Sequence, residues 1–521
     1  MTAATSNAKP MLTVVVSPRE MHVLAEASLR SVLADDSAPF DLIYLDILSP
    51  PETAAAVDAL CAERDFPVIR HNGWIAPSAA RKIALTRVAT PYVVFIDNDV
   101  FVEPGCFARL LACAEETGAG LVGPLYLQGP ADQREVHMAG GRLERDEAGA
   151  IVADEYVLST EPEVAAESLQ RQQVDFVEYH CVLARTALAR EPDVLSDEVL
   201  HTREHIHTAL ASRERGFSVW LEPTARVHFG HYTPPRIGDL AFYHRRWDEA
   251  ECEKSIAAFC RRWPVAEPDR FLVGIRSFVR HKWGLSHALR PGVERTGLEQ
   301  PMPATELAQT RTALREQAIA AGCDAASVRA LESACDYATL LSDGLYRADG
   351  RPFLNHLIGT ASVLVRYGFR QDVVLAGLLH AAYTHRPPWF DPDEISRVLA
   401  SGGEADTIVR GLPDAKAQLA AGASAGTLTL LEGCSLAVEA ASEADTLLSG
   451  EYRASGRPPE LKPAGASLLS EVLGQLEAPG LAATAMSPPG DGLQGPVLGR
   501  GPPFDSFRLD AQNRRWTSAQ G

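Results

Sequence analysis

Apolar runs of strand length alternate with helical segments from residue 11 to about 130, and this alternation restricts the fold more than any other feature. The predicted strands lie at 12–16, 42–47, 68–69 and 92–96. The predicted helices between them lie at 20–34, 53–64 and 78–88. Such alternation favours a mainly parallel sheet with helices on both faces, so we predict an α/β fold.

The remainder of the chain divides by pattern and composition. Residues 131–290 are mixed, with strands predicted at 174–183 and 218–221 and helices at 199–214, 239–260 and 268–281. We predict a first domain at 1–290, a linker at 291–304 and a helical domain at 305–450. Residues 451–521 are rich in Pro and Gly, which predicts a disordered tail.

Length and charge exclude several classes of protein. A chain of 521 residues is too long for one ordinary core, and its net charge of −19 argues against binding nucleic acid or anionic lipid. The longest apolar runs fall far short of the roughly 20 residues that a membrane-spanning helix needs. Nine cysteines without CxxC pairs and an N-terminus without a signal-peptide pattern predict a cytoplasmic protein with reduced thiols.

Three polar residues follow the buried strand predicted at 92–96. Asp97, Asn98 and Asp99 stand at its carboxyl end, where ligands collect in open α/β sheets. Carboxylates at i and i+2 can hold a hard divalent cation that also binds substrate phosphates. The alternative is a solvated turn without a function.

Five segments carry a resemblance to a known family. They are LTVVVSPRE (12–20), NGWIAPSAARKIAL (72–85), YVVFIDNDVFVEPGCFARLL (92–111), REHIHTALASRERGFSVWLEPTARVHF (203–229) and FYHRRWD (242–248). In this order they resemble family 2 glycosyltransferases of the GT-A fold. Lys82 stands where the family usually has Asn. The resemblance covers about the first 265 residues. It implies an enzyme that transfers a sugar from a nucleotide diphosphate donor, with a UDP-sugar expected, to an acceptor with inversion.

The resemblance also implies roles for individual residues. Asp97, Asn98 and Asp99 would bind the donor, and Arg81 would assist unless it is a solvent-facing helix residue. Mn²⁺ or Mg²⁺ would be held by Asp97, Asp99 and His228, with His231 as a rival to the histidine.

A general base must accept the proton of the acceptor hydroxyl. Glu204 is the first candidate, and His205 is the second because it replaces the second acid of the family's Glu-Asp pair. His201 is expected to be solvated, and Glu20 is expected to be a helix N-terminal acid rather than a uridine contact.

The segment RPFLNHLIGTASVLVRYGFRQDVVLAGLLHAAYTH (351–385) resembles the HD superfamily of metal-dependent phosphohydrolases. His356 and His380 match its histidines, and Asp445 could supply its last acid. Ala381 stands where the motif requires Asp, which removes a metal ligand; His385 could compensate. We therefore expect a degenerate domain that binds no metal and serves in binding or dimerisation.

Two functions remain open at this point. The first is a metal-dependent glycosyltransferase acting on a small molecule, peptide or glycan, with homo-oligomerisation through the helical domain as a further possibility. The alternative is a nucleotide-sugar-binding scaffold whose helical domain is the phosphohydrolase. The intact Asp97–Asp99 motif beside the broken HD motif favours the first.

Overall fold

The computed structural model describes residues 9–230, 235–284, 286–293, 296–347, 349–385, 392–400, 403–451, 463–486, 507–510 and 515–518. The chain forms two compact units, Met1–Ser286 and His287–Gly521. Among the described residues, no helix is long and apolar enough to span a membrane.

A mixed sheet forms the centre of the first unit. Its strands and those of a separate hairpin are β1 (Leu12–Ser17), β2 (Phe40–Ile47), β3 (Val68–His71), β4 (Tyr92–Asp97), β5 (Val100–Val102), β6 (Leu121–Gln128), β7 (Glu135–Met138), β8 (Gly141–Arg145), β9 (Ile151–Tyr156), β10 (Gln172–Val174), β11 (Cys181–Arg185) and β12 (Val219–Phe229). The sheet order is β10-β12-β6-β11-β4-β1-β2-β3, with β5 beside β12 and β7 beside β6. Strands β1 to β4 run parallel, and β11 runs antiparallel to β4 and β6.

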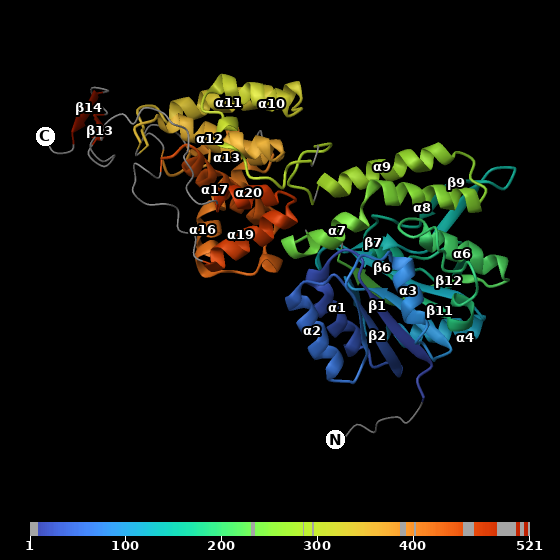
Figure 1. The fold of residues 1–521 in the computed structure, drawn as a ribbon. Coiled ribbons are helices and arrows are strands. Elements are labelled where there is room, and N and C mark those ends of the chain that lie inside the picture. Colours follow the sequence, from blue (N-terminus) through green and yellow to red (C-terminus); the bar gives the residue numbers. More distant parts are fainter. Residues whose placement is uncertain are drawn as a thin grey trace. The chain divides into compact units, whose positions relative to one another are not determined.

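Helices pack around this sheet (Figure 1). They are α1 (Ala25–Ala34), α2 (Pro51–Ala62), α3 (Pro77–Leu85), α4 (Cys106–Thr117), α5 (Thr186–Ala189), α6 (Glu204–Glu214), α7 (Leu240–Arg246), α8 (Glu249–Arg262) and α9 (Pro268–Gly284). All side chains of β1 and β4 are buried, as expected for strands covered on both faces. The α/β fold class is confirmed.

Two elements of the first unit differ from the prediction in ways that matter for the site. The strand predicted at 174–183 is instead the short β10 and β11, and residues 175–180 connect them. The helix predicted at 239–260 is interrupted between α7 and α8, where the Asp248 side chain accepts a hydrogen bond from the Glu251 N–H and caps α8. Polar side chains decided both cases, because they bond locally instead of continuing the regular element.

The described part of the second unit is mainly helical. Its helices are α10 (Arg311–Ala320), α11 (Ala325–Leu341), α12 (Phe353–Arg366), α13 (Gln371–Leu378), α14 (Pro392–Ala400), α15 (Ala405–Arg410), α16 (Leu412–Ala421), α17 (Leu430–Leu448), α19 (Pro463–Gln475) and α20 (Pro479–Ala485). A hairpin is formed by β13 (Phe507–Asp510) and β14 (Arg515–Ser518). Within the predicted linker, Leu298 and Met302 are buried.

Part of the predicted disordered tail is folded. Residues 463–486 contain α19 and α20, whose Val472, Leu473 and Leu481 are fully buried. The Pro- and Gly-rich composition of 451–521 hid a short helical repeat of apolar residues, so the prediction of disorder is wrong for this stretch. The rest of the tail, apart from Glu451 and the β13–β14 strands, lies outside the described residues.

Candidate active site

Asp97, Asn98 and Asp99 lie at the carboxyl end of β4, and all three are fully buried. Three backbone hydrogen bonds hold the turn. The Asp97 N–H donates to the His180 carbonyl at 3.1 Å, the Asn98 N–H donates to Ser17 at 2.9 Å, and the Asp99 carbonyl accepts from Gly230 at 3.0 Å. The ends of β1, β11 and β12 therefore meet at this point, and the solvated-turn alternative is wrong.

Asp97 is surrounded by positive and imidazole groups. Its carboxylate lies 3.3 Å from Arg81, 3.5 Å from Arg19 and 3.1 Å from Nδ1 of His180. Both arginines are more than four-fifths buried. The carboxylate thus has compensating charge from the chain itself.

Asp99 is in the opposite situation. Neither of its carboxylate oxygens has a hydrogen-bond partner among the described residues, although both are buried. Burial, with the negative charges of Asp97 and Glu20, holds the pKa of Asp99 well above its usual range. A buried carboxylate without partners requires a proton or a cation, so these two oxygens fit a divalent metal ion.

Arg19 connects the acids of the site. Its guanidinium lies 3.5 Å from Asp97 and 3.9 Å from both Glu20 and Glu204, and its backbone N–H donates to the Asn98 side-chain oxygen at 3.0 Å. Two guanidinium nitrogens of Arg19, Nε and Nη1, are buried and make no hydrogen bond within the described chain. Both nitrogens face carboxylates at ion-pair distance only, so their hydrogen-bonding capacity is left for a ligand.

Glu20 does not act as a helix N-terminal acid. Its carboxylate pairs with Lys282 of α9 at 3.1 Å, and both side chains are about 95% buried. Burial alone would raise the pKa of Glu20, but the charges of Lys282 and Arg19 lower it to about 2. This ion pair fastens α9 beside the site.

Arg81 on α3 is fully buried, so the solvent-facing alternative is wrong. Its guanidinium lies 3.8 Å from the centre of the Tyr179 ring, and its Nε and Nη1 have no hydrogen-bond partner among the described residues. Like Arg19, it combines an ion pair to Asp97 with unused donors.

The two candidate bases lie at the start of α6, after Arg203 in a left-handed conformation. Glu204 is buried, and its carboxylate lies 3.9 Å from Arg19. Nε2 of His205 lies 3.1 Å from the Tyr156 hydroxyl and 3.6 Å from the Glu178 carboxylate. Burial lowers the pKa of His205, against the charges of Glu178 and Glu204.

His228 lies on β12, where Nε2 is 2.6 Å from the Gly129 carbonyl oxygen. Among the residues that the structure describes, no group of three close metal-ligand side chains combines it with Asp97 and Asp99. Its metal role stays a prediction, and its rival His231 lies outside the described residues.

Sequence reasoning missed Arg19, Glu178, His180 and Lys282. Glu178 and His180 were assigned to a strand, although a Glu-Tyr-His sequence inside an apolar run was a visible signal. Arg19 and Lys282 gave no such signal, because only the fold brings α9 to the end of β1.

Buried histidines make the first unit sensitive to acid. His201 was expected to be solvated but is buried beside Trp74, and burial with the Arg246 charge lowers its pKa to about 4. A depressed histidine pKa means that the unfolded chain binds the proton more tightly, so stability falls as the pH drops from 6.5 towards 4, by at most about 1.4 kcal/mol per pH unit.

We expect His201→Gln to make the urea midpoint less dependent on pH in this window. His71→Gln, at an exposed histidine, is the control, and equal slopes in the two variants would contradict the assignment.

In the second unit, an arginine compensates the last acid of the HD-like motif. Arg351 contacts the two oxygens of Asp445 at 2.7 and 3.2 Å, and Nδ1 of His356 lies 2.7 Å from the same carboxylate. Burial alone would raise the pKa of Asp445, but His356 and Arg351 lower it to about 2. Nδ1 of His380 lies 2.7 Å from the Gly377 carbonyl oxygen. His385 is exposed, and its Nδ1 lies 2.9 Å from the Thr384 hydroxyl.

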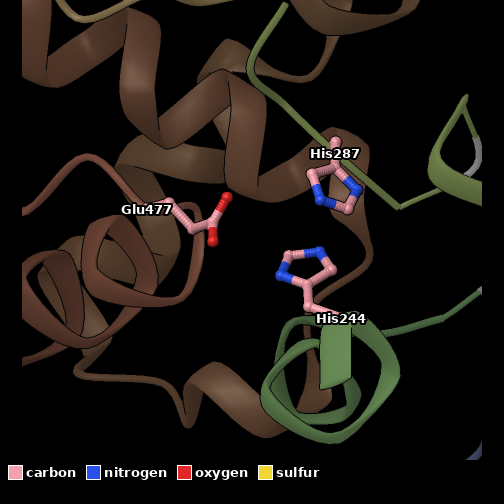
Figure 2. Close-up of side chains that lie close together, drawn as sticks. All are labelled: His244, His287 and Glu477. Carbon is pink, nitrogen blue, oxygen red and sulfur yellow. The ribbon is translucent and has the colours of Figure 1, made fainter. Parts of the chain in front are cut away.

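Within either unit, the described residues contain no group of three His, Cys, Asp or Glu ligands close enough to hold a metal ion unaided. Figure 2 shows His244, His287 and Glu477, of which the first belongs to one unit and the others to the second. We assign no site to these three. Within its own unit, Nε2 of His244 lies 3.2 Å from the Ser286 carbonyl oxygen.

Residues 20–177 match the family Glycosyl transferase family 2. The match includes the Asp97–Asp99 turn and Arg81, and it ends directly before Glu178. Residues 20–177 of the first unit are therefore similar to family 2 glycosyltransferases.

Two solved structures resemble the chain at low identity. GalNAc-T7 with UDP, GalNAc and Mn²⁺ is 14% identical, with 53% of this chain and 56% of that chain covered and a TM-score of 0.35. The mannosyltransferase PcManGT from Pyrobaculum calidifontis, in complex with GDP-Man and Mn²⁺, is 14% identical, with 71% and 87% covered and a TM-score of 0.32. The match thus spans just over half of the GalNAc-T7 chain. No curated protein matches the chain significantly.

Proposed function

We propose that this protein transfers a sugar, with inversion, from a nucleoside diphosphate donor to a hydroxyl group of a small molecule, peptide or glycan. A UDP-sugar is the expected donor. The observation that carries the proposal is the set of buried atoms without partners around β4. The acceptor oxygens of Asp99 stand in the same site as the unused donors of Arg19 and Arg81.

These two kinds of unpartnered atoms suit the two parts of a metal–diphosphate ligand. Asp99 would hold Mn²⁺ or Mg²⁺, with Asp97 and His228 as further candidate ligands. When bound, the ion supplies positive charge that stabilises the departing diphosphate. Arg19 and Arg81 would donate to the phosphate oxygens, and Asn98 would orient the turn through its bond to Arg19. Because Asp99 is fully buried, donor binding requires the covering residues to move.

The test is nucleotide release from a panel of UDP-sugars and GDP-mannose, with Mn²⁺, with Mg²⁺ and in EDTA. We expect release with one or more donors in the presence of metal and none in EDTA. A protein that binds UDP equally well in EDTA would contradict the metal assignment. A protein that neither binds nor cleaves any donor would contradict the function.

The alternative function, a phosphohydrolase in the helical unit, is disfavoured by the Arg351–Asp445 pair. The guanidinium already neutralises the carboxylate that would face a metal, and Ala381 supplies no ligand. The unit then serves as a binding or dimerising module.

A metal-free helical unit has a direct test in the full-length protein. We expect Asp99→Asn, incubated with Mn²⁺ or Fe²⁺ and desalted, to contain no stoichiometric metal by elemental analysis and to hydrolyse no nucleotide or phosphoester. This variant removes one donor-site ligand, and comparison with the His380→Ala double variant locates any metal that is still retained. Retention that is then lost in Asp99→Asn/His380→Ala would contradict the expectation and make His385 a candidate ligand.

A further inference from the structure

Three side chains from separate elements of the first unit meet, and one of them, Glu178, is influenced by the charge of Arg19. His205 lies at the start of α6, Tyr156 ends β9, and Glu178 lies in the connection between β10 and β11. The Tyr156 hydroxyl donates to Oε1 of Glu178 and lies 3.1 Å from Nε2 of His205. Glu178 and His205 are 4% and 8% exposed, so little solvent competes for these contacts.

The direction of these hydrogen bonds determines which nitrogen of His205 can accept a proton. Tyr156 gives its only proton to Glu178, so its oxygen must accept from Nε2–H of His205. In a neutral imidazole the other nitrogen, Nδ1, is then the acceptor. Nδ1 has no hydrogen-bond partner among the described residues, and so it is free to receive a proton.

The charges around the three residues agree with this arrangement. Burial disfavours the Glu178 carboxylate, but the charges that His205 and His180 carry when protonated, together with Arg19 and the hydrogen bond from Tyr156, hold the pKa of Glu178 well below its usual range. Burial and the Glu178 charge raise the pKa of Tyr156, which therefore keeps its proton. Burial also lowers the pKa of His205, which keeps the imidazole neutral and able to act as a base near neutral pH.

We propose that Nδ1 of His205 is the proton acceptor for the acceptor hydroxyl, and that Tyr156 and Glu178 are positioning residues that fix its tautomer. This inference rests on the proposed transfer reaction. Glu178 thereby supplies, from another element, a carboxylate that the chain lacks at position 205. Glu204, ion-paired to Arg19, keeps a role in positioning that arginine beside the donor.

The step balances without an added reagent. The acceptor O–H bond breaks and its proton passes to Nδ1 of His205, while the acceptor oxygen forms a bond to the anomeric carbon. The bond from that carbon to the diphosphate oxygen breaks, and its electron pair leaves on the nucleoside diphosphate. The nearby Glu178 carboxylate, 3.6 Å from Nε2, stabilises the imidazolium that forms.

The experiment follows nucleotide release from the most active UDP-sugar with Mn²⁺, using water as the acceptor, since water needs the same base. We expect His205→Gln to lower kcat by about 10²-fold or more while UDP binding by calorimetry is unchanged. Tyr156→Phe, which removes the link to Glu178, should lower kcat less and also leave UDP binding unchanged. Glu204→Gln is the comparison variant, and it should cost less kcat than His205→Gln.

The pH profile of kcat in Glu178→Gln tests the positioning role of Glu178, because a merely structural role would not shift that profile. The charges that face His205 are those of Glu178, Glu204, Arg203 and Asp154, and removing the first makes the imidazolium less stable. The acidic limb of the kcat profile should therefore shift to lower pH in Glu178→Gln and return towards wild type in Glu178→Asp.

A lowered kcat with an unmoved limb would overturn the proposal, as would a larger kcat loss in Glu204→Gln than in His205→Gln. If Glu178→Gln does not fold, Tyr156→Phe is the deciding variant, and an unchanged kcat in that variant overturns the proposal. If wild type neither binds nor cleaves any donor, the transfer function fails and this inference with it.

Discussion

Asp99→Asn is expected to raise the stability of the metal-free protein and to abolish its metal-dependent binding of the donor. The two effects have one cause. Both carboxylate oxygens of Asp99 are buried and unpartnered among the described residues, next to the charges of Asp97 and Glu20. An unsatisfied buried group costs about 1–3 kcal/mol, and more when it is charged, so a neutral amide of the same shape should relieve part of that cost.

The measurement is thermal unfolding in EDTA and in Mn²⁺ with UDP, at pH 7.5. Wild type should gain stability on adding metal and UDP together, whereas Asp99→Asn should be more stable in EDTA and gain nothing. Asp36→Asn, at an exposed aspartate that follows α1, is the control and should behave as wild type. A variant that is less stable than wild type in EDTA would show that Asp99 has a partner within the chain.

Arg351→Met is expected to destabilise the helical unit by about 3–5 kcal/mol, the usual cost of removing one partner from a buried ion pair. Asp445 is fully buried and faces Arg351, His356 and Gln309. Without the guanidinium its negative charge lacks a permanent counter-charge. The double variant Arg351→Met/Asp445→Asn should be more stable than the single one, because it removes both charges.

Amide hydrogen exchange can follow the second unit separately from the first. The matched control is Arg347→Met, because Arg347 pairs with Glu451 and is 24% exposed, against 12% for Arg351. We expect a markedly smaller loss of protection in that control. Equal losses in the two variants would show that the Asp445 charge is compensated by another group.

The central elements of the first unit and the position of its candidate site could be predicted from the sequence. Buried parallel strands are continuous apolar runs, and the acids that follow the run at 92–96 must stand at the carboxyl edge of the sheet. That information is local, because strand periodicity and the residues at its end lie within a dozen positions of each other. The same local reading failed at 463–486, where composition outweighed a short helical pattern.

The tertiary structure alone decided what each acid faces. Asp97 and Asp99 occupy similar positions in the sequence, yet their surroundings differ. The fold places Arg81, Arg19 and His180 beside Asp97, whereas the carboxylate of Asp99 has no hydrogen-bond partner among the described residues. The carboxylate nearest His205 comes from Glu178, 27 positions away, since the connection between β10 and β11 passes the start of α6. Charge and burial depend on such distant neighbours, and no pattern along the chain encodes them.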